Sequence, residues 1–560
     1  MHHSKVRRFS SFACAVLIAQ VALAGLCRGA MPTLEQKLDQ YLKASQEVRQ
    51  FTGAVLIAQR GKILYAKAYG MADIEKKQPN TVDTKFLIGS ITKQFTATAI
   101  MQLEAKGKLR LDDPITKHLT DYPKETGDKI TINELLTHTS GIPNFTDLPA
   151  YMPMRSTPTS PKEILKRFDE MPLEFVPGKQ FSYSNSGYIV LGLIIEKVSG
   201  ETYAAYLRTH IFEPLGMKNT GYMDYSVTPR AIGYEPDSTG KLKRAIQVDP
   251  SVPYAAGALY STVGDMFIWD QALYGDKVLS QDELQKMWTP NLENYGYGWL
   301  IDTVFGQKRI WHNGAIDGFV SGFQRFVNDS LCIVMLSNNG GLAEGLMSVN
   351  LAAIMFHQPY SVPVNKTPGK IDPALLADYV GAYEISPNVY RLIKREGDTL
   401  YALRTGGPAR RLYPETQDLF YYDFDNSVTL NFVRDSTGKV IGHQIYQNGE
   451  TTSAKRLFGR LADSLLASPL VARVDSSKLD ALVGRYQLVP QVMIDIRRKG
   501  DSLFAQITNQ PELEIFPRSE TDFFFKAVDA QITFVKDASG QAASLIVHQG
   551  GRDVTAMRVK

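Results

Sequence analysis

An internal repeat in the C-terminal third of the chain limits the folds that this sequence can adopt. Val380-Gly381-Ala382-Tyr383 returns as Val483-Gly484-Arg485-Tyr486, and Gly397-Asp398-Thr399-Leu400 returns at the same spacing as Gly500-Asp501-Ser502-Leu503. In each copy, alternating polar and apolar residues lead into a Gly-Asp turn and then into another such segment, which is typical of a β-hairpin. Because a sequence that repeats at this length builds the same unit twice, we expect two small antiparallel β-barrels.

Two stretches divide the rest of the chain into candidate domains. Residues 358–369 are rich in proline and polar residues, and a second, weaker stretch surrounds Ala467-Ser468-Pro469. They separate one large piece from the two copies of the repeat. The expected segments are a signal peptide at 1–30, a large domain at 31–357, and barrels at 373–460 and 474–560.

The large piece has strand patterns at both of its ends. Residues 53–59 and 62–69 predict two strands joined by a turn at Arg60-Gly61. Strands are expected again near 297–303 and over 319–336. Helical patterns lie between these strands, at 90–106, around 132–136 and at 188–198. We therefore expect an α+β domain in which strands from both ends share one antiparallel sheet, followed by the two barrels.

The composition is that of an ordinary globular chain and favours no polyanionic partner. Of the 560 residues 44% are hydrophobic and 21% are charged, which excludes disorder, collagen and coiled coil. The 62 lysines and arginines exceed the 58 acidic residues by only four. Lys5, Arg7 and Arg8 supply most of that excess. We therefore expect binding neither to nucleic acid nor to anionic lipid headgroups.

The N-terminus has the pattern of a secretory leader. The three cations precede an apolar run from Phe12 to Leu26, and Ala22-Leu23-Ala24 forms a small-x-small site near its end. We expect an exported protein, periplasmic or secreted, without stable membrane insertion after cleavage. An uncleaved membrane anchor is the alternative, although a membrane span usually takes about 18 or more apolar residues.

A Ser-x-x-Lys sequence lies in the first helical segment of the large domain. On a helix, Ser90 and Lys93 are one turn apart on the same face, and that face continues through Ala97 and Ile100. The lysine thus shares an apolar stripe, and burial disfavours its charged form. A neutral amine beside a hydroxyl can take the serine proton. The alternative is a helix-capping serine and a solvated lysine.

Two further motifs follow the Ser-x-x-Lys in the chain. Tyr183 and Asn185 are two residues apart in an extended loop before a helix, and the alternative is that they are turn residues. Trp311-His312-Asn313-Gly314-Ala315 opens a strand region, where Gly314 lets a substrate approach the backbone closely. A histidine there is otherwise structural. Together and in this order, the three motifs indicate a nucleophilic hydrolase site.

With these motifs, the chain resembles the serine β-lactamase and penicillin-binding protein superfamily, on the class C side, where the middle motif is Tyr-x-Asn. The resemblance covers roughly residues 35 to 355. Other stretches share it, namely Leu135 to Pro143, Pro177-Gly178, Pro214 to Met217 and Gly257 to Thr262. With His-x-Gly as third motif and two appended barrels, the architecture is most similar to three-domain enzymes of the D-aminopeptidase type.

The resemblance implies a role for each motif residue. Ser90 would be the nucleophile that forms an acyl-enzyme, with Lys93 and Tyr183 as the proton-transfer pair. Asn185 would hold the substrate amide or the lysine. The backbone N–H groups of Ser90 and Ala315, the latter following Gly314, would form the oxyanion hole. No metal ion or organic cofactor is implied.

The third motif departs from the family pattern at His312. Relatives that bind penicillins or a terminal D-Ala usually have lysine there, which helps to hold a free carboxylate. An unperturbed histidine, with a pKa of about 6.5, is mostly neutral at pH 7. We therefore expect peptides cut from the amino end, amides or esters rather than β-lactams. Asp317 could attract a substrate ammonium group, or it could simply make a turn.

The sequence thus predicts an exported serine hydrolase that acts on a small peptide, amide or ester. A peptidase or amidase, with a D-aminopeptidase as one form, ranks above an esterase, and a β-lactamase or D-Ala-D-Ala carboxypeptidase comes third. The alternative of another class is a penicillin-recognising sensor that is acylated without turnover. The oligomeric state stays open, a dimer included.

Overall fold

The fold is described from a computed structural model of the chain. The description covers residues 32–148, 151–237, 240–386, 389–404, 409–422, 428–447, 450–467, 476–489, 492–499, 502–508, 512–517, 520–525, 530–537, 540–549 and 552–559. The expected leader, the joint at Ser468-Pro469 and the turn at Gly500-Asp501 lie outside these residues.

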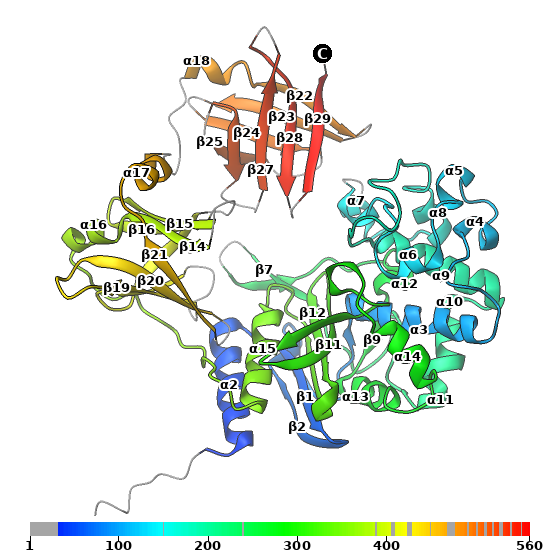
Figure 1. The fold of residues 1–560 in the computed structure, drawn as a ribbon. Coiled ribbons are helices and arrows are strands. Elements are labelled where there is room, and N and C mark those ends of the chain that lie inside the picture. Colours follow the sequence, from blue (N-terminus) through cyan, green and yellow to red (C-terminus); the bar gives the residue numbers. More distant parts are fainter. Residues whose placement is uncertain are drawn as a thin grey trace, which may run out of the picture.

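A six-stranded antiparallel sheet forms the centre of the first domain, in the order β10-β11-β12-β13-β1-β2. Two of its strands come from the start of the domain and four from its end, as expected (Figure 1). The strands are β1 (Gly53–Gln59), β2 (Lys62–Tyr69), β10 (Leu300–Val304), β11 (Gln307–Ile316), β12 (Phe319–Phe326) and β13 (Leu331–Ser337). The β1–β2 turn is local: Arg60 and Gly61 have φ of 51° and 73°, the left-handed pair that a two-residue hairpin turn requires.

The sheet is covered on both faces, and β1 shows how the sequence produces this. Its successive side chains point to opposite faces. Val55 and Ile57 pack in a core with α2 (Leu34–Arg49) and α15 (Glu344–Met355). Ala54, Leu56 and Ala58 pack in the larger core on the opposite face. Every residue of β1 but the last is buried, as a central strand between two layers must be.

The larger core is built around two long helices, α3 (Thr92–Ala105) and α9 (Asn185–Ser199). The remaining described elements of this domain are short and are η1 (Gly89–Ile91), α4 (Ile115–His118), α5 (Lys124–Gly127), α6 (Ile132–Leu136), η2 (Phe145–Asp147), α7 (Tyr151–Met154), α8 (Pro161–Leu165), α10 (Tyr203–Leu207), η3 (Arg208–Phe212), α11 (Glu213–Leu215), α12 (Tyr254–Gly257), α13 (Val263–Ala272), α14 (Gln281–Met287), η4 (Leu292–Asn294), η5 (Val327–Asp329), β3 (Met71–Asp73), β4 (Gln78–Pro79), β5 (Phe86–Leu87), β6 (Gly221–Tyr222), β7 (Tyr234–Pro236), β8 (Leu242–Arg244) and β9 (Leu259–Ser261).

Two local expectations need correction. Helix α9 begins at Asn185, not at residue 188, so Asn185 belongs to the helix rather than to the loop before it. The backbone N–H of Asn185 donates to Asn144 Oδ1 at 2.9 Å. The N–H groups of the first helical turn have no partner within the helix, and the side chain of Asn144, distant in sequence, supplies one. His312 lies in the middle of β11 and does not open the strand, because the strand begins at Gln307 in the hairpin with β10.

The C-terminal part forms two closed antiparallel barrels of eight strands each, as the repeat predicted (Figure 1). The first contains β14 (Gly381–Ser386), β15 (Val389–Glu396), β16 (Thr399–Arg404), β17 (Ala409–Pro414), β18 (Leu419–Tyr422), β19 (Thr429–Arg434), β20 (Val440–Gln447) and β21 (Glu450–Arg456). The second contains β22 (Gly484–Val489), β23 (Val492–Lys499), β24 (Ser502–Ile507), β25 (Leu513–Pro517), β26 (Asp522–Phe525), β27 (Ala530–Lys536), β28 (Ala542–Gln549) and β29 (Arg552–Val559). Short helices accompany them, namely η6 (Pro373–Leu375), α16 (Leu376–Tyr379), α17 (Arg460–Ala467) and α18 (Ser476–Leu479).

The repeated Val-Gly-x-Tyr sequence closes each barrel in the same way. In the first barrel, Arg456 donates to the carbonyl of Val380, and a Cβ on Gly381 would lie 2.9 Å from the Arg456 Nε. In the second barrel, Arg558 donates to the carbonyl of Val483, and a Cβ on Gly484 would lie 2.8 Å from the Arg558 Nε. The glycine therefore leaves room for an arginine from the last strand to lie across the first.

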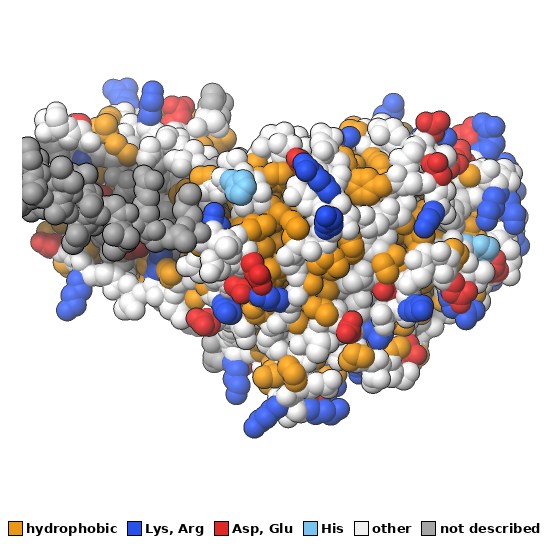
Figure 2. Space-filling view, turned by 90° about the horizontal axis from the view of Figure 1, so that it is seen from below, with side chains coloured by type: hydrophobic (Ala, Val, Ile, Leu, Met, Phe, Trp, Pro, Cys, Tyr) orange, Lys and Arg blue, Asp and Glu red, His pale blue; other side chains and the backbone are white. Residues whose placement is uncertain are grey.

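The surface carries charges of both signs. Figure 2 shows lysine, arginine and acidic side chains dispersed around apolar patches on the face seen from below. Ile63 and Leu64 of the edge strand β2 are 52% and 43% exposed. Among the residues that the structure describes, no helix has both the length and the apolar character of a membrane span.

One buried ion pair joins a helix of the larger core to the sheet. Arg325 of β12 donates to Asp270 of α13 at 2.6 Å, and both side chains are 0% exposed. We predict that Asp270→Asn lowers the free energy of unfolding by about 3–5 kcal/mol, because it leaves the guanidinium buried without a counter-charge. Chemical denaturation measures this loss. Asp112→Asn, in the exposed pair with Arg110, is the matched control and should leave the midpoint unchanged. Equal stability of the two variants would contradict the prediction.

Candidate active site

Ser90 lies in η1, the short turn that leads directly into α3. Gly89 before it has φ of 50°, and a Cβ at this position would lie only 2.8 Å from the backbone nitrogen of Ala315. Glycine is needed here both for the left-handed conformation and for the close approach to β11. The turn therefore brings Ser90 next to the third motif.

Lys93 Nζ is buried and lies between three oxygen atoms. Ser90 Oγ is 3.0 Å away, Asn185 Oδ1 is 2.8 Å away and the carbonyl oxygen of Ala256 is 2.8 Å away. These partners belong to η1, α9 and α12, so the amine connects three elements. The Lys93 side chain as a whole is 0% exposed.

Burial lowers the pKa of Lys93 well below the ordinary lysine value. The cause is the loss of hydration of the ammonium form on burial. A neutral amine has two N–H donors and one lone pair. Asn185 Oδ1 and the Ala256 carbonyl only accept hydrogen bonds, so they take the two donors. The lone pair is then left to accept from the Ser90 hydroxyl.

Tyr183 lies over the same amine. Its ring centroid is 4.9 Å from Lys93 Nζ. Burial raises the pKa of Tyr183 above its ordinary value, while a hydrogen bond with Ser90 acts in the opposite direction. The phenol therefore stays protonated at neutral pH, where it can donate a proton to an oxygen or nitrogen at Ser90.

The orientation of the Asn185 amide is fixed by its neighbours. Its Nδ2 donates to Thr146 Oγ1 at 3.1 Å, and its Oδ1 accepts from Lys93. The loop that carries Asn144 and Thr146 thus holds both the backbone and the side chain of Asn185. Asn144 and Thr146 were not predicted, because nothing in their local sequence shows which distant group they contact.

His138 is a site neighbour to which the sequence reasoning gave no role. Its ring centroid lies 4.2 Å from that of Tyr183, and its Nδ1 accepts from the backbone N–H of Ser184 at 3.1 Å. Burial first, and then Lys93, lower the pKa of His138 well below its ordinary value. The neutral imidazole therefore packs against the ring of Tyr183 and accepts a hydrogen bond from the backbone of the next residue. The signal was present, since His138 belongs to one of the stretches that carry the family resemblance.

His312 is also buried and uncharged. Its Nδ1 lies 2.5 Å from the carbonyl oxygen of Asn313, and its Nε2 lies 2.9 Å from the Tyr295 hydroxyl. Burial, with the nearby Lys93 as second cause, lowers the pKa of His312 to about 3. The ring is then neutral at any working pH, with Nδ1–H donating to the carbonyl and Nε2 accepting from the tyrosine. His312 cannot supply the positive charge of a lysine.

The segment after His312 approaches the turn of Ser90 closely. A Cβ on Gly314 would lie 1.9 Å from the carbonyl oxygen of Ile88, so only glycine fits. Strand β10 pairs with β11 only as far as Trp311. On the side that β10 leaves uncovered, the edge of β11 with Gly314 and Ala315 faces η1, and the structure describes no strand beside it there. An oxyanion hole formed by the N–H groups of Ser90 and Ala315 would require such an uncovered edge.

Asp317, two residues beyond Ala315, is paired. Its Oδ2 lies 3.0 Å from Arg155 Nε, and the arginine side chain is 8% exposed. Arg155 follows α7, so the pair fastens the α7 segment to the turn between β11 and β12. Asp317 already has a cationic partner in this structure. Within the described residues, no group of three or more His, Cys, Asp or Glu side chains could hold a metal ion.

Comparison with known proteins identifies the class. The Beta-lactamase family model matches residues 38–352, and a domain of unknown function, DUF3471, matches residues 469–558. A penicillin-binding protein of Bacillus subtilis (strain 168) is 31% identical over 408 residues, which are 67% of this chain and 88% of the relative. The chain belongs to the beta-lactamase and penicillin-binding protein family and has the fold of its serine hydrolases.

Solved structures of similar proteins support this assignment. The octameric penicillin-binding protein homologue from Pyrococcus abyssi is 26% identical, with a TM-score of 0.55 over 75% of this chain and 99% of that one. A D-stereospecific amidohydrolase from Streptomyces sp. is 27% identical, with a TM-score of 0.51 over 57% of this chain and 98% of that one. The D-amino acid amidase from Ochrobactrum anthropi SV3, complexed with D-phenylalanine, is 27% identical, with a TM-score of 0.50 over 57% of this chain and 99% of that one.

The neutral state of His312 has a consequence for the pH dependence of the enzyme. We predict that His312→Gln changes the rate without changing the shape of the kcat/KM profile between pH 5 and pH 8. A group with a pKa of about 3 does not titrate in that range. Initial rates on an uncharged ester measure both profiles. An inflection near pH 6.5 in the parent enzyme that disappears in the variant would contradict the prediction.

Proposed function

We propose that the protein is an exported serine hydrolase that forms an acyl-enzyme on Ser90 and acts as an amidase or peptidase on small substrates. The observation that carries this proposal is the contact between Lys93 Nζ and Ser90 Oγ at 3.0 Å. The two N–H bonds of the amine are held by Asn185 Oδ1 and the Ala256 carbonyl. Its lone pair is therefore directed at the serine hydroxyl, which makes Lys93 the general base.

Acylation follows from this arrangement. Ser90 Oγ attacks the substrate carbonyl carbon while its proton passes to Lys93. The backbone N–H groups of Ser90 and Ala315 stabilise the oxyanion, where loss of one such donor typically costs roughly 10²- to 10³-fold in rate. Tyr183 donates a proton to the leaving amine and is reprotonated through Lys93. Water then attacks the acyl-enzyme, and the same groups return the proton to Ser90.

The charge distribution favours a substrate without a free carboxylate beside the scissile bond. His312 is neutral, and Arg155 is already paired with Asp317. Two structural relatives are described as a D-stereospecific amidohydrolase and a D-amino acid amidase. We therefore rank D-amino acid amides and peptides cut from the amino end above esters, and esters above β-lactams. Export rests on the leader pattern of Lys5, Arg7, Arg8 and the apolar run after them.

The first test is a substrate panel with the parent enzyme and Ser90→Ala. We expect the parent to hydrolyse D-alanyl anilide faster than L-alanyl anilide, a short acyl ester or a chromogenic cephalosporin. Ser90→Ala should lose at least roughly 10³-fold in kcat, because the nucleophile is absent. Steady-state absorbance assays give both numbers. Turnover of the cephalosporin alone would contradict the argument from His312.

The same panel separates a hydrolase from a sensor. A sensor keeps its acyl group, so mass spectrometry would find Ser90 acylated after substrate is exhausted, with no more than one product released per enzyme. A hydrolase releases product repeatedly and returns to the free mass. Persistent acylation without turnover on every substrate would reject the proposed amidase and favour the penicillin-recognising sensor.

The pH profile tests the state of Lys93. Neutral amine is lost as the pH falls through the lowered pKa and is fully present above it. We predict that kcat/KM for an uncharged ester is already level at pH 9, where a lysine with an ordinary pKa of about 10.4 would be only partly neutral. Lys93→Ala should be slow at every pH. Lys106→Ala, an exposed lysine just after α3, is the control and should follow the parent. A rise of about fivefold or more between pH 9 and pH 10 in the parent, as an ordinary lysine would give, would count against the assignment.

A further inference from the structure

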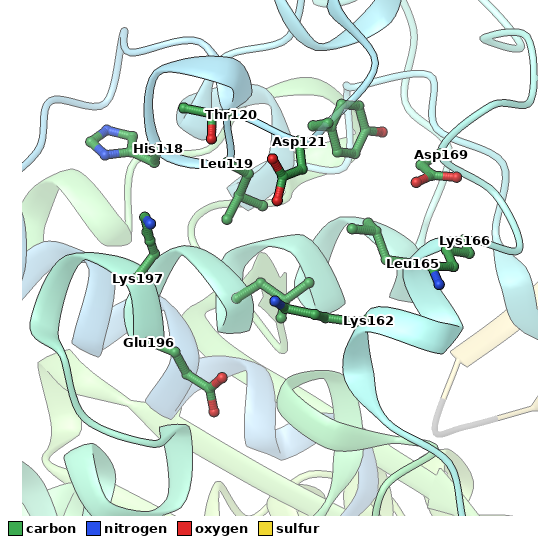
Figure 3. Close-up of a pocket in the computed structure, with 12 residues that line it drawn as sticks. His118, Leu119, Thr120, Asp121, Lys162, Leu165, Lys166, Asp169, Glu196 and Lys197 are labelled. Carbon is green, nitrogen blue, oxygen red and sulfur yellow. The ribbon is translucent and has the colours of Figure 1, made fainter.

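A cavity opens in the first domain, between the segment of residues 118–122, α8 and the C-terminal half of α9 (Figure 3). Its volume is about 400 Å³. That size lies within the roughly 300–1,000 Å³ of typical small-molecule sites. None of its lining residues belongs to the site of Ser90, so the cavity is a separate feature.

The floor of the cavity is apolar. Leu119, Leu165 and Leu193 line it, together with Tyr122, whose side chain is only 3% exposed. Leu193 comes from α9 and is 7% exposed. An occupant can therefore bury an apolar group against three leucines, and such burial is favourable by roughly 25 cal/mol per Å².

Charged groups of both signs surround this floor without pairing. The positively charged residues of the lining include Lys162 of α8 and Lys197 of α9, and the negatively charged ones include Asp121 and Asp169. None of these four forms an ion pair with any residue in the part of the chain described here. Figure 3 shows Lys197 extending from α9 toward the segment that carries Asp121, while Asp121 is directed back toward α9.

The other charged residues of the lining are already engaged. Glu196 Oε1 accepts from the backbone N–H of Tyr203 at 2.8 Å, Lys166 lies 2.9 Å from Glu163 Oε1, and His118 lies 2.9 Å from Asp113 Oδ2. This leaves two ammonium groups and two carboxyl groups around one partly apolar space. Three of the four, Asp121, Lys162 and Lys197, are exposed to solvent. A ligand that pairs with groups of both signs carries both a carboxylate and an ammonium group.

We propose that this cavity binds a zwitterionic small molecule with an apolar side chain, of the class of free amino acids and dipeptides. Its carboxylate lies between Lys162 and Lys197, its ammonium group faces Asp121 and Asp169, and its side chain rests on the leucines. This site is independent of the proposed reaction at Ser90, since none of these residues touches the serine, Lys93 or Tyr183.

Calorimetric titration of the Ser90→Ala protein with L-alanyl-L-leucine tests the proposal, because that variant removes turnover and leaves the cavity intact. Lys162→Ala/Lys197→Ala in the same background should bind about tenfold more weakly, since it removes both exposed partners of the carboxylate. Lys124→Ala, an exposed lysine of α5 outside the lining, should bind like its parent. Thermal denaturation checks that all variants are folded.

The ammonium half of the site has its own test. N-acetyl-L-alanyl-L-leucine lacks the positive charge and should bind several-fold more weakly to the parent, and Asp121→Asn should not weaken it further. Three results would each overturn the proposal: no binding of the dipeptide at 10 mM, affinity of the double lysine variant within twofold of its parent, or equal affinity for the dipeptide and its acetylated form. Because the protein lacks the nucleophile, the readout does not depend on turnover, and the double lysine variant separates binding in this cavity from binding at the site of Ser90.

Discussion

One uncharged amine holds together the parts of the candidate active site. Lys93 Nζ contacts the turn of Ser90, the first residue of α9 and a carbonyl of α12, and its burial is what removes its charge. Burial disfavours the ammonium form because that form loses its hydration. The same low polarity keeps His138 and His312 neutral and Tyr183 protonated. Burial is thus the first cause of the pKa shifts of Lys93, His138, His312 and Tyr183.

Local signals in the sequence predicted several parts of the fold well. The β1–β2 hairpin was placed at the correct residues, because its turn chemistry at Arg60-Gly61 and its strand patterns lie within one short stretch. The two barrels followed from the repeat, and the structure adds the reason for its glycines, which make room for Arg456 and Arg558. These features depend on neighbouring residues or on a comparison of the chain with itself.

The parts that sequence reasoning missed depend on distant contacts. The start of α9 at Asn185 is fixed by the side chain of Asn144, which belongs to a different loop. The hydrogen bond between Tyr295 and His312 joins residues on different elements, and neither residue's neighbours indicate it. Patterns predicted that Ser90, Tyr183 and His312 belong to one site. They could not show that the imidazole is buried and uncharged, since that state comes from packing across the whole domain.

The pairing of β1 with β13 also governs the order in which the domain can form. Gly53 lies opposite Ser337 in the sheet, so the first strand has no partner on that side until the chain has been synthesised almost to the end of the domain. Contacts between residues so far apart in sequence form slowly, because a long loop must close first. Until then the β1–β2 hairpin exposes the unpaired edge of the apolar strand β1, which is a hazard for self-association. Within the first domain, a chaperone that binds the nascent chain would meet the first apolar strand at Gly53–Gln59.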